Sequence, residues 1–566
     1  MPYRAPLADF HFILGQIIGF DAIAATERFS LAGPETVEAI LTEAAKLSQN
    51  TLAPLNRAGD KHPARLENGI VRTSPGFAAA FRAIGDGGWL GMSASAEVGG
   101  MGLPMTLTTC VNEMMGSACL SLQLNPLMTQ GQIEALEHHA SDEIKALYIP
   151  KLLNGDWCGT MNLTEAQAGS DVGALRSKAE DNGDGSYAIS GQKVYISWGD
   201  SDLAQNICHL VLARLPGGGE GTKGISLFIV PKILPNADGT LGARNTLKVV
   251  SLEHKLGLHG SPTAVMQYDK AKGWLVGEVH KGMAAMFTMM NNARLGVGVQ
   301  GLSVAEGAYQ HALAYAQERK QGPTPLGDGA IIDHADVRRM LAVMKAQVFG
   351  ARAIALACAA SIDMARATGD LAWSARAALL TPINKSFGTQ TGTEVADMGI
   401  QVHGGMGYIE ETGAAQYLRD VRVTAIYEGT NGIQAMDLVG RKMMDAGEAA
   451  FRLIDEMQVS AVKARQTHRD LSQEVWNAAE ALRESTDLLI GQSMQDRSAG
   501  AVPYQRAFAL ILTGHFHLKA AMADPARLPL ARLAIRRLMP DYAPLLGQLR
   551  EGADSLYAVT PEALSA

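Results

Sequence analysis

The residue best suited to acid–base chemistry in this 566-residue chain is Glu428, within the segment Ala-Ile-Tyr-Glu-Gly-Thr-Asn at residues 425–431. Burial beside an apolar ligand would raise the pKa of this carboxyl group and make it a usable general base near neutral pH. Gly429 permits close approach of a ligand and leaves an N–H group free to point at a carbonyl oxygen. A glutamate in such a turn is, on its own, more often structural than catalytic, so the rest of the chain must decide.

Four other motifs accompany this segment. They are MNLTEAQAGSD at 161–171, GQKVYIS at 191–197, YAQER at 315–319 and QVHGGMGY at 401–408. In order and spacing, the chain resembles the acyl-CoA dehydrogenase flavoenzymes over about residues 39–444. One such motif would be weak evidence, whereas five in order are specific.

The resemblance implies FAD as the cofactor and Glu428 as the catalytic base. The implied cofactor-binding residues are Met161, Leu163, Thr164, Ser170, Tyr195, Ser197, Arg319, Gln401, Gly404, Gly405 and Thr430. The implied substrate-binding residues are Ser170, Asn291, Arg294, Tyr427 and Gly429, and no metal site is expected. In the family the arginine that matches Arg319 binds FAD phosphate across a subunit interface, but the loop that follows it is altered here.

Most of these residues also have plain structural explanations. Taken alone, the loop at 164–171 is better explained as a capped turn. Tyr195 is also consistent with a buried strand aromatic, and Arg319 with a cation at a helix C-terminus. The glycines at 404–407 suit a simple loop between helices, and we expect His403 to be a packed residue of that loop rather than a catalyst.

Two positions narrow the chemistry. Some family members carry their base immediately before the arginine that matches Arg294, and here that residue is Ala293, which leaves Glu428. Many members have aspartate where this chain has Asn291, so the details of CoA binding differ here.

The glycines of Gly-Val-Gly-Val-Gln-Gly at 296–301 fit a dinucleotide fingerprint, but a helical run precedes them where a strand is needed. We therefore expect these glycines to serve helix packing.

Composition describes a globular protein, with 47% hydrophobic and 19% charged residues and a formal charge of −8. The negative charge argues against nucleic acid or an anionic membrane as the main partner. We expect no membrane span, because no apolar run looks long enough, and no signal peptide. Five cysteines without CxxC pairing indicate reduced thiols in a cytoplasmic protein.

The hydrophobic pattern changes along the chain and predicts an α+β multidomain protein. We expect an N-terminal extension at 1–35, a helical domain at 36–157, an antiparallel β domain at 158–278, a helical bundle carrying the base at 279–444, and an extra helical domain at 445–566. Strands are expected at 186–196, 207–215, 224–230 and 264–268, and a break at 497–503 should divide the last domain.

The resemblance implies α,β-dehydrogenation of an acyl-CoA thioester to a trans-2-enoyl-CoA, with electrons passed to an electron-transferring flavoprotein. The long form is similar to the bacterial 3-(methylthio)propanoyl-CoA dehydrogenases of dimethylsulfoniopropionate breakdown, although relatives of this length also take ordinary acyl chains. Acyl chains of about four to six atoms are expected to be preferred. Members with such a C-terminal extension tend to be homodimers. An acyl-CoA oxidase and a non-catalytic CoA-binding relative remain as alternatives, the second disfavoured by the presence of Glu428.

Overall fold

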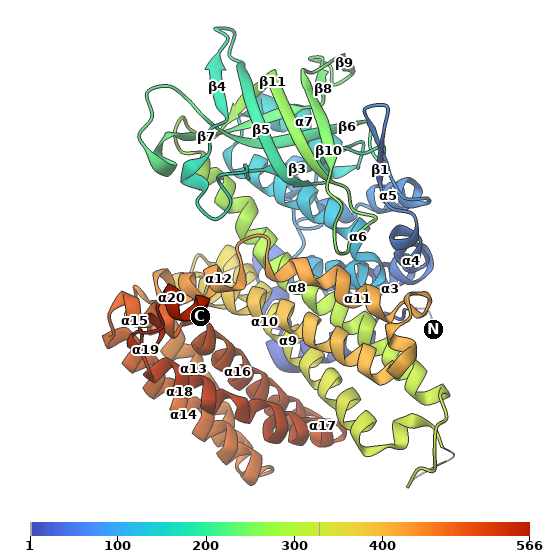
Figure 1. The fold of residues 1–566 in the computed structure, drawn as a ribbon, viewed down its shortest axis with the longest axis vertical. Coiled ribbons are helices and arrows are strands. Elements are labelled where there is room, and N and C mark those ends of the chain that lie inside the picture. The colour runs from blue at the N-terminus through green and yellow to red at the C-terminus, as the bar shows by residue number, and fades with distance from the viewer. Residues whose placement is uncertain (1–2, 326, 328) are drawn as a thin grey trace.

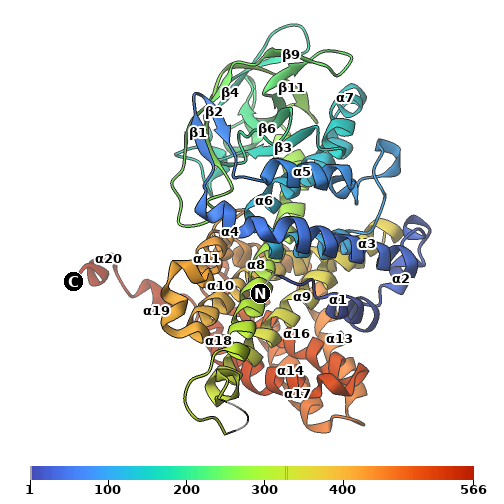
Figure 2. The same cartoon turned by 90° about the vertical axis from the view of Figure 1, so that its right-hand side faces the viewer.

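The computed structural model describes residues 3–325, 327 and 329–566 and shows a β domain stacked on a large helical body (Figure 1). The α+β multidomain architecture expected from the sequence is confirmed. The N-terminal extension and the extra C-terminal helices complete the helical body. Figure 2 shows α3 and α4 crossing between the sheet layer and the bundle.

The N-terminal extension is an integral part of the core. It forms α1 (Leu7–Phe12), η1 (Ile13–Ile18), α2 (Asp21–Ala24) and η2 (Glu27–Phe29). Its apolar side chains, among them Phe10, Ile13 and Phe29, are buried in the same cluster as the long helices of the bundle.

The helical domain that follows is interrupted by a short hairpin. Its elements are α3 (Pro34–Lys46), η3 (Leu47–Leu52), α4 (Ala53–Lys61), β1 (Arg65–Glu67), β2 (Ile70–Arg72), α5 (Phe77–Asp86), η4 (Trp89–Gly91), η5 (Ala96–Val98), α6 (Met105–His139) and α7 (Asp142–Leu153). The β1–β2 hairpin was not expected, since three-residue strands are too short to establish a periodicity of two.

The β domain contains β3 (Trp157–Asn162), η6 (Val172–Ala174), β4 (Lys178–Asp181), β5 (Tyr187–Ser197), β6 (Asn206–Arg214), η7 (Gly221–Gly224), β7 (Ile225–Pro231), β8 (Ile233–Pro235), β9 (Leu241–Arg244), β10 (Leu247–Leu252) and β11 (Thr263–Val276). The main sheet has the order β10-β11-β5-β4-β6-β3, with β7 paired to β11 and β6.

The β domain is mostly antiparallel, as expected, with two parallel pairings that the sequence did not predict. Strand β3 pairs in parallel with β6, from Trp157↔Asn206 to Asn162↔Val211, and β4 meets β6 in parallel at Lys178↔Arg214. The chain between β3 and β6 contains β4 and β5, so the connection is long enough to bring β6 alongside β3 in the same direction. Only neighbouring hairpins force antiparallel pairing, and the sequence pattern does not record which distant strands meet.

The bundle is built from α8 (Gly282–Glu318), η8 (Ile331–Asp333), α9 (Ala335–Thr368), α10 (Leu371–His403), η9 (Gly404–Tyr408), η10 (Glu410–Thr412), α11 (Ala414–Val421), η11 (Arg422–Ala425), α12 (Asn431–Val439) and η12 (Arg441–Met443). Glycines let α8 and α10 pack backbone to backbone. A Cβ added to Gly392 would lie 2.5 Å from the carbonyl oxygen of Gly301, and Gly388 faces Gly298 in the same way. The helix-packing interpretation of the Gly296–Gly301 string is therefore confirmed.

Helix α9 corrects the expectation that no apolar run has the length of a membrane span. Within the described residues it is long and apolar enough by length and composition alone. However, 83% of the apolar stretch is buried inside the protein. The helix is the core helix of the bundle, surrounded by α6, α8, α10 and α16.

The C-terminal extension packs against the bundle along α9, α10 and α12. Its elements are α13 (Glu448–Ala464), α14 (Arg469–Gly491), α15 (Met494–Ala499), α16 (Ala501–Ala523), η13 (Pro525–Arg527), α17 (Leu528–Leu533), η14 (Ala534–Leu538), η15 (Met539–Asp541), α18 (Tyr542–Arg550), α19 (Asp554–Tyr557) and α20 (Pro561–Ser565). The break expected at 497–503 is found at Gly500, between the end of α15 at Ala499 and the start of α16 at Ala501. A further break lies earlier, between the end of α14 at Gly491 and the start of α15 at Met494, and Pro503 is accommodated in the first turn of α16.

A buried ion network ties the two ends of the chain to the bundle. Asp9 lies 2.6 Å from the Lys345 ammonium and 3.0 Å from the Arg527 guanidinium. Arg352, fully buried, is 2.6 Å from Glu306 and donates three hydrogen bonds to Glu113. The N-terminal extension, α6, α8, α9 and the C-terminal extension meet at this network.

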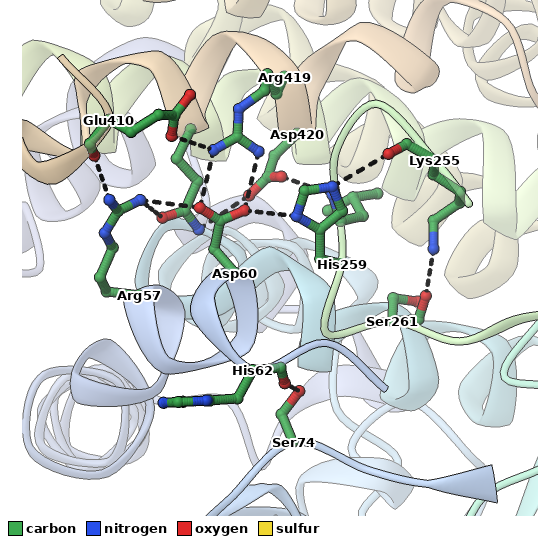
Figure 3. Close-up of polar contacts among 12 residues, drawn as sticks. Arg57, Asp60, His62, Ser74, Lys255, His259, Ser261, Glu410, Arg419 and Asp420 are labelled. Atoms are coloured by element: carbon green, nitrogen blue, oxygen red, sulfur yellow. Dashed lines mark hydrogen bonds and ion pairs between the residues drawn. The ribbon is translucent and has the colours of Figure 1, made fainter. Parts of the chain in front are cut away.

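A second polar cluster joins three parts of the molecule (Figure 3). Asp60 of α4 accepts hydrogen bonds of 2.9 and 2.8 Å from Arg419 of α11, and its carboxylate lies 2.9 Å from the Nδ1 atom of His259. Next to it, the Leu258 N–H donates to Asp420 at 2.6 Å. The loop between β10 and β11 is thereby held against both the N-terminal helices and the bundle.

Candidate active site

Glu428 lies in a tight turn between η11 and the start of α12. Its φ angle is +55° and that of Gly429 is +83°, so two consecutive residues adopt the left-handed conformation. A side chain at position 429 would also meet Gln434, since an added Cβ lies 2.8 Å from its Nε2 atom. Thr430 then caps α12 by accepting a hydrogen bond from the Ile433 N–H at 3.2 Å.

Burial raises the pKa of Glu428 to about 7, against an opposing effect from the positive charges of Arg294 and Lys385. Desolvation penalises the carboxylate form, while a nearby cation favours it. The net result is a carboxyl group that exchanges its proton near neutral pH. Such a group can take a proton from a weak carbon acid and later release it.

Arg294 of α8 is a second buried charge beside Glu428. It is 6% exposed and lies 3.8 Å from Asp437 of α12, which Arg441 also contacts at 2.5 Å. Burial lowers the pKa of Arg294, while Asp437 and Glu428 counter that effect. Its Nε atom is buried and has no hydrogen-bond partner among the described residues, so the hydrogen bonding of this guanidinium is incomplete.

A cleft of about 330 Å³ lies beside Arg294. Its wall comes from α6, α8, α9, α10, α12 and η12, and includes Thr288, Asn291, Asn292, Arg294, Ser374, Thr381, Asp437 and Lys442. The Glu134–Arg366 ion pair belongs both to this cleft and to a neighbouring cavity of about 150 Å³. The structure thus brings Asn291 and Arg294, predicted from separate observations, to one concave surface.

On its other side the Glu428 turn meets a buried hydrogen-bond chain. The Tyr427 hydroxyl donates to Gln300 at 2.5 Å, and the Gln300 amide donates to Gln123 at 3.3 Å. The two glutamines are 1% and 2% exposed. Gln300 lies six residues after Arg294 on α8, roughly 9 Å along the helix.

The predicted cofactor residues of the β domain gather at the ends of β3 and β5. The Val194 N–H donates to the Thr164 carbonyl at 2.9 Å, and the Lys193 ammonium donates to the Leu163 carbonyl at 2.9 Å. Met161 and Leu163 are half-buried there, and Ser197 pairs with Thr263 of β11. Ser170 is exposed, in the loop that follows.

Glu165 holds the 164–171 loop together. Its carboxylate accepts a hydrogen bond of 2.6 Å from the Ser177 hydroxyl and lies 2.9 Å from the fully buried Lys193 ammonium. Burial alone would raise the pKa of Glu165, but Lys193, Ser177 and a main-chain N–H lower it to about 2. The loop is therefore a fixed structure around an ion pair, which supports the capped-turn explanation without excluding ligand contacts at its exposed edge.

Tyr195 is not the buried strand aromatic that was one explanation of it. Its side chain is 65% exposed and its φ angle is +61°. A non-glycine residue in this conformation is uncommon, and it turns the aromatic ring out of the sheet. An exposed aromatic face at a strand end is suited to stacking on a planar ligand.

The remaining predicted cofactor residues lie at the far end of the bundle. The Tyr315 ring stacks on His403 with centroids 4.4 Å apart, which places the end of α8 beside the end of α10. Arg319, Gln401, Gly404 and Gly405 are all exposed there. His403 is 3% exposed, with its Nδ1 atom 2.7 Å from the Gly399 carbonyl, so its interpretation as a packed residue is confirmed.

These residues do not form one site within a single chain. From Arg294 to Arg319, α8 rises by roughly 37 Å. Figure 1 shows α8 starting below the sheet and ending on the far side of the bundle. Glu428, Tyr427, Gly429, Thr430 and Arg294 are together, whereas the Arg319 group is remote from them.

Sequence reasoning missed several residues that shape the Glu428 turn. They are Lys385, Gln300, Gln123 and Asp437, which come from four different helices and contact the turn or its neighbours. The available signal was a polar residue inside an apolar or small-residue helical run, as Gln300 is within Gly296–Gly301. Each of the five cysteines is a buried free thiol, and no cluster among the described residues could hold a metal ion.

Comparison with known proteins matches this arrangement to three family models. The chain matches the N-terminal domain of acyl-CoA dehydrogenases over residues 34–156, the middle domain over 160–271 and the C-terminal domain over 280–444. It is also 44% identical over 529 residues to 3-methylmercaptopropionyl-CoA dehydrogenase of Ruegeria pomeroyi, covering 91% of this chain and 89% of that protein. The chain belongs to the acyl-CoA dehydrogenase family.

Further relatives show how broad that family is. A broad-specificity linear acyl-CoA dehydrogenase of Mycobacterium tuberculosis is 35% identical over 482 residues, with 81% of this chain and 78% of that protein covered. Among solved structures, ACDH-11 of Caenorhabditis elegans in complex with C11-CoA aligns with a TM-score of 0.79 at 19% identity, over 94% of this chain and 90% of that one. A Bacillus anthracis acyl-CoA dehydrogenase complexed with FAD gives 0.71 at 20% identity, over 93% and 90%. The last two similarities extend through the C-terminal helices and show the fold.

As a member of this family, the protein is an acyl-CoA dehydrogenase, a flavoprotein oxidoreductase that dehydrogenates acyl-CoA thioesters.

Proposed function

We propose that Glu428 is the base that removes the α-proton of a short acyl-CoA, converting it to a trans-2-enoyl-CoA. The observation that carries this assignment is the position of Glu428, whose burial raises the carboxyl pKa to about 7 next to Arg294, a residue that lines the cleft. The family resemblance points to the same residue, and Ala293 occupies the alternative base position.

The turn also supplies the group that makes the α-proton removable. An α-proton of a thioester is only weakly acidic, so negative charge developing on the thioester oxygen must be stabilised as the proton leaves. The Glu428 N–H is the donor for that oxygen in our proposal, since it belongs to the same rigid turn as the carboxylate. Glu428 is half-buried, and a bound acyl-CoA would exclude the remaining water from both groups.

FAD fits the residues present. Tyr195 offers an exposed aromatic face, and Gly404 and Gly405 have open space where side chains would otherwise stand. Thr164, Ser170 and Ser197 supply hydroxyl groups, and Arg319 an exposed guanidinium for phosphate. These residues would hold FAD, which would supply the acceptor for the hydride that leaves the β-carbon; in our proposal an electron-transferring flavoprotein then takes the electrons.

The Tyr427–Gln300–Gln123 chain supports a short substrate. The cleft at Asn291 lies before Arg294 on α8, and Gln300 lies beyond it, so a thioester at Glu428 with CoA in the cleft directs its acyl chain toward Gln300. A buried hydrogen-bond chain cannot be displaced by an apolar tail without leaving unpaired polar groups. We therefore propose acyl chains of about four to six atoms, including 3-(methylthio)propanoyl, because CH₂ and S have similar size and apolarity.

The separation of the Arg319 group from the β-domain residues supports a homodimer. In our proposal Arg319, Gln401, Gly404 and Gly405 of one subunit complete the FAD site of the other, as the family resemblance implies.

We further propose that the protein is cytoplasmic, that it acts in dimethylsulfoniopropionate breakdown, and that its domains meet at residues 35, 157, 278 and 444.

The function is tested by mixing the purified flavoprotein anaerobically with butanoyl-, 3-(methylthio)propanoyl- and palmitoyl-CoA and following the loss of flavin absorbance. We expect rapid bleaching with the first two, differing by at most about 1–3 kcal/mol in transition-state free energy. Glu428→Gln should keep its FAD and bind acyl-CoA, but lose about 10²–10⁴-fold or more of the bleaching rate. A preference for palmitoyl-CoA would overturn the short-chain proposal, and rapid bleaching by Glu428→Gln would overturn the base.

An oxidase is separated from a dehydrogenase in the same preparation. Under air with acyl-CoA alone, stoichiometric hydrogen peroxide would indicate an acyl-CoA oxidase. Slow peroxide formation, with fast turnover when an electron-transferring flavoprotein is added, is the result we expect.

A further inference from the structure

Lys385 is a buried cation that the chemistry proposed above does not use. It lies in the middle of α10 and its side chain is 0% exposed. An ammonium group is strongly hydrated, so a lysine is rarely buried to this extent unless its protons have defined acceptors. The acceptors here are both on the Glu428 turn.

The Lys385 ammonium donates to the Gly429 carbonyl at 2.8 Å and to the Asn431 side-chain oxygen at 3.0 Å. Asn431 is in turn hydrogen bonded to Thr389, one helical turn after Lys385, at 3.0 Å. The Gln434 amide donates to the Glu428 carbonyl at 3.2 Å. Both carbonyl groups of the left-handed pair are therefore fixed by side chains from α10 and α12.

This fixation matters because the turn is conformationally costly. A glutamate at positive φ is disfavoured by roughly 1–3 kcal/mol and persists only where its surroundings determine it. If the Gly429 carbonyl were released, the peptide between residues 429 and 430 could rotate, and one of the two restraints on the left-handed pair would be lost. The backbone at residues 428 and 429 could then relax, which would shift the Glu428 side chain and its main-chain N–H.

We propose that Lys385 is a positioning residue for the dehydrogenation, which holds the Glu428–Gly429 turn through the Gly429 carbonyl and Asn431 so that the Glu428 carboxylate and N–H face one substrate. The inference rests on the proposed role of Glu428. It adds Lys385, which is 44 residues from Gly429 in the sequence and is brought to the turn by the fold.

The charge of Lys385 has a second, measurable consequence. The charged groups that act on Glu428 are Arg294 from α8 and Lys385 from α10, with Asp437 of α12 paired to Arg294. Burial lowers the pKa of Lys385 to about 7, and Glu428 opposes that effect. Both cations favour the carboxylate, so loss of Lys385 should move the pKa of Glu428 upward.

The test measures anaerobic flavin bleaching by saturating butanoyl-CoA between pH 6 and 9. The variants are Lys385→Met, Lys385→Arg, Asn431→Ala and the control Lys519→Met. Lys519 is a half-buried lysine on α16 that also donates to a main-chain carbonyl, that of Ile17, but remote from Glu428. FAD content and thermal unfolding are recorded for each.

We expect Lys385→Met to retain FAD and a KM within about threefold, to lose roughly 10²-fold in bleaching rate, and to reach half-maximal rate at higher pH than the wild type. Lys385→Arg should recover part of the rate and the wild-type midpoint. Asn431→Ala should lower the rate without moving the midpoint, since it removes no charge. Lys519→Met should match the wild type.

A wild-type rate and pH midpoint in Lys385→Met would overturn the inference, as would equal losses in Lys385→Met and Lys519→Met. If Lys385→Met does not fold, Lys385→Arg and Asn431→Ala decide: wild-type rates in both overturn it, and a lowered rate in Asn431→Ala with a wild-type midpoint supports it. The proposed function fails separately, when no acyl-CoA bleaches the wild type or when Glu428→Gln bleaches as fast.

Discussion

At the scale of single residues, the Glu428 turn places a carboxylate and a main-chain N–H where burial changes the chemistry of both. The same burial that raises the pKa of Glu428 to about 7 would strengthen a hydrogen bond from its N–H. Arg294 and Lys385 limit the shift, because two cations nearby keep the carboxylate accessible at neutral pH. The pKa of Glu428 is therefore set by the burial and the charges around it, and not by the glutamate side chain alone.

The raised pKa of Glu428 predicts opposite pH effects on rate and on stability. The bleaching rate should rise with pH and reach half its maximum near pH 7, where the carboxylate forms. Because the folded pKa exceeds the ordinary value of 4.5, the ionised group disfavours the folded state increasingly from about pH 4.5 to 7. Glu428→Gln should therefore unfold at a higher temperature than the wild type at pH 8 and at the same temperature at pH 4.5. An equal difference at both pH values would contradict the shifted pKa.

Gln300 gives a second prediction at this scale. Gln300→Ala removes the acceptor of the Tyr427 hydroxyl and the donor to Gln123, and opens space beyond Glu428. We expect the ratio of kcat/KM for octanoyl-CoA over butanoyl-CoA to rise by at least about 10-fold, since each added methylene in an apolar pocket is worth about 1–3 kcal/mol. Gln317→Ala, an exposed glutamine on the same helix, is the matched control. An unchanged ratio in a folded, FAD-containing variant would show that Gln300 does not close the acyl pocket.

At the scale of helices and loops, ion networks between elements that are far apart in the sequence fix how those elements are placed relative to one another. The Asp60 cluster in Figure 3 joins α4, the β10–β11 loop and α11. Burial would raise the pKa of Asp60, but Arg419, His259 and Arg57 outweigh it and lower the pKa. The Asp9 network does the same between the two ends of the chain. Both networks keep the layers that carry the candidate site in register.

Asp9→Asn should destabilise the protein by about 3 kcal/mol at pH 7, because it leaves Lys345 and Arg527 without a buried counter-charge. Burial opposes ionisation of Asp9, but Lys345 and Arg352 lower its pKa to about 2. A lowered pKa stabilises the folded state above about pH 4, and that contribution is lost as the pH falls toward 2. Urea unfolding of the wild type and Asp9→Asn should therefore differ at pH 7 and converge in acid. Asp21→Asn, an exposed aspartate in the same extension, should be neutral.

The sequence predicted the local motifs and not the distant pairings. Glu428 and its glycine could be recognised because their chemistry lies within seven consecutive residues. Lys385 reaches the turn from 44 residues away and Gln300 reaches Tyr427 from 127. The Asp9–Arg527 contact spans 518 residues. Hydrophobic periodicity reports which face of an element is buried, but not which charged group of another element it will meet. The parallel β3–β6 pair was missed for the same reason.

At the scale of the whole molecule, a single chain presents two incomplete halves of the proposed FAD site. The β-domain group with Thr164 and Tyr195 lies at the ends of β3 and β5. The group with Arg319 and Gly404 lies where α8 and α10 end, and α8 ends on the far side of the bundle (Figure 1). The C-terminal extension covers a face made by α9, α10 and α12, and so limits which surfaces remain for a second subunit. A two-fold dimer, in which each subunit lends its bundle end to the other, satisfies both facts.

Arg319 tests that arrangement. Arg319→Ala should lose FAD on dialysis, because a guanidinium that binds phosphate would be missing, whereas Arg339→Ala, an exposed arginine at the start of α9 paired with Asp336, should stay yellow. If Arg319→Ala keeps the FAD content of the wild type after dialysis, Arg319 does not bind FAD and is only a cation at the end of a helix.

Hybrid dimers then decide whether Arg319 acts within its own chain or across the interface. Arg319→Ala and Glu428→Gln subunits, carrying different affinity tags, are refolded together and the mixed dimer is isolated with FAD. If Arg319 serves the partner, one site of the hybrid combines an intact Glu428 with an intact Arg319, and the hybrid should regain about half the wild-type rate per dimer. If Arg319 serves its own chain, each site lacks one group and the hybrid stays as slow as its parents. Recovery would place the second half of the FAD site on the neighbouring subunit, and no recovery would require a single chain to bridge the length of α8.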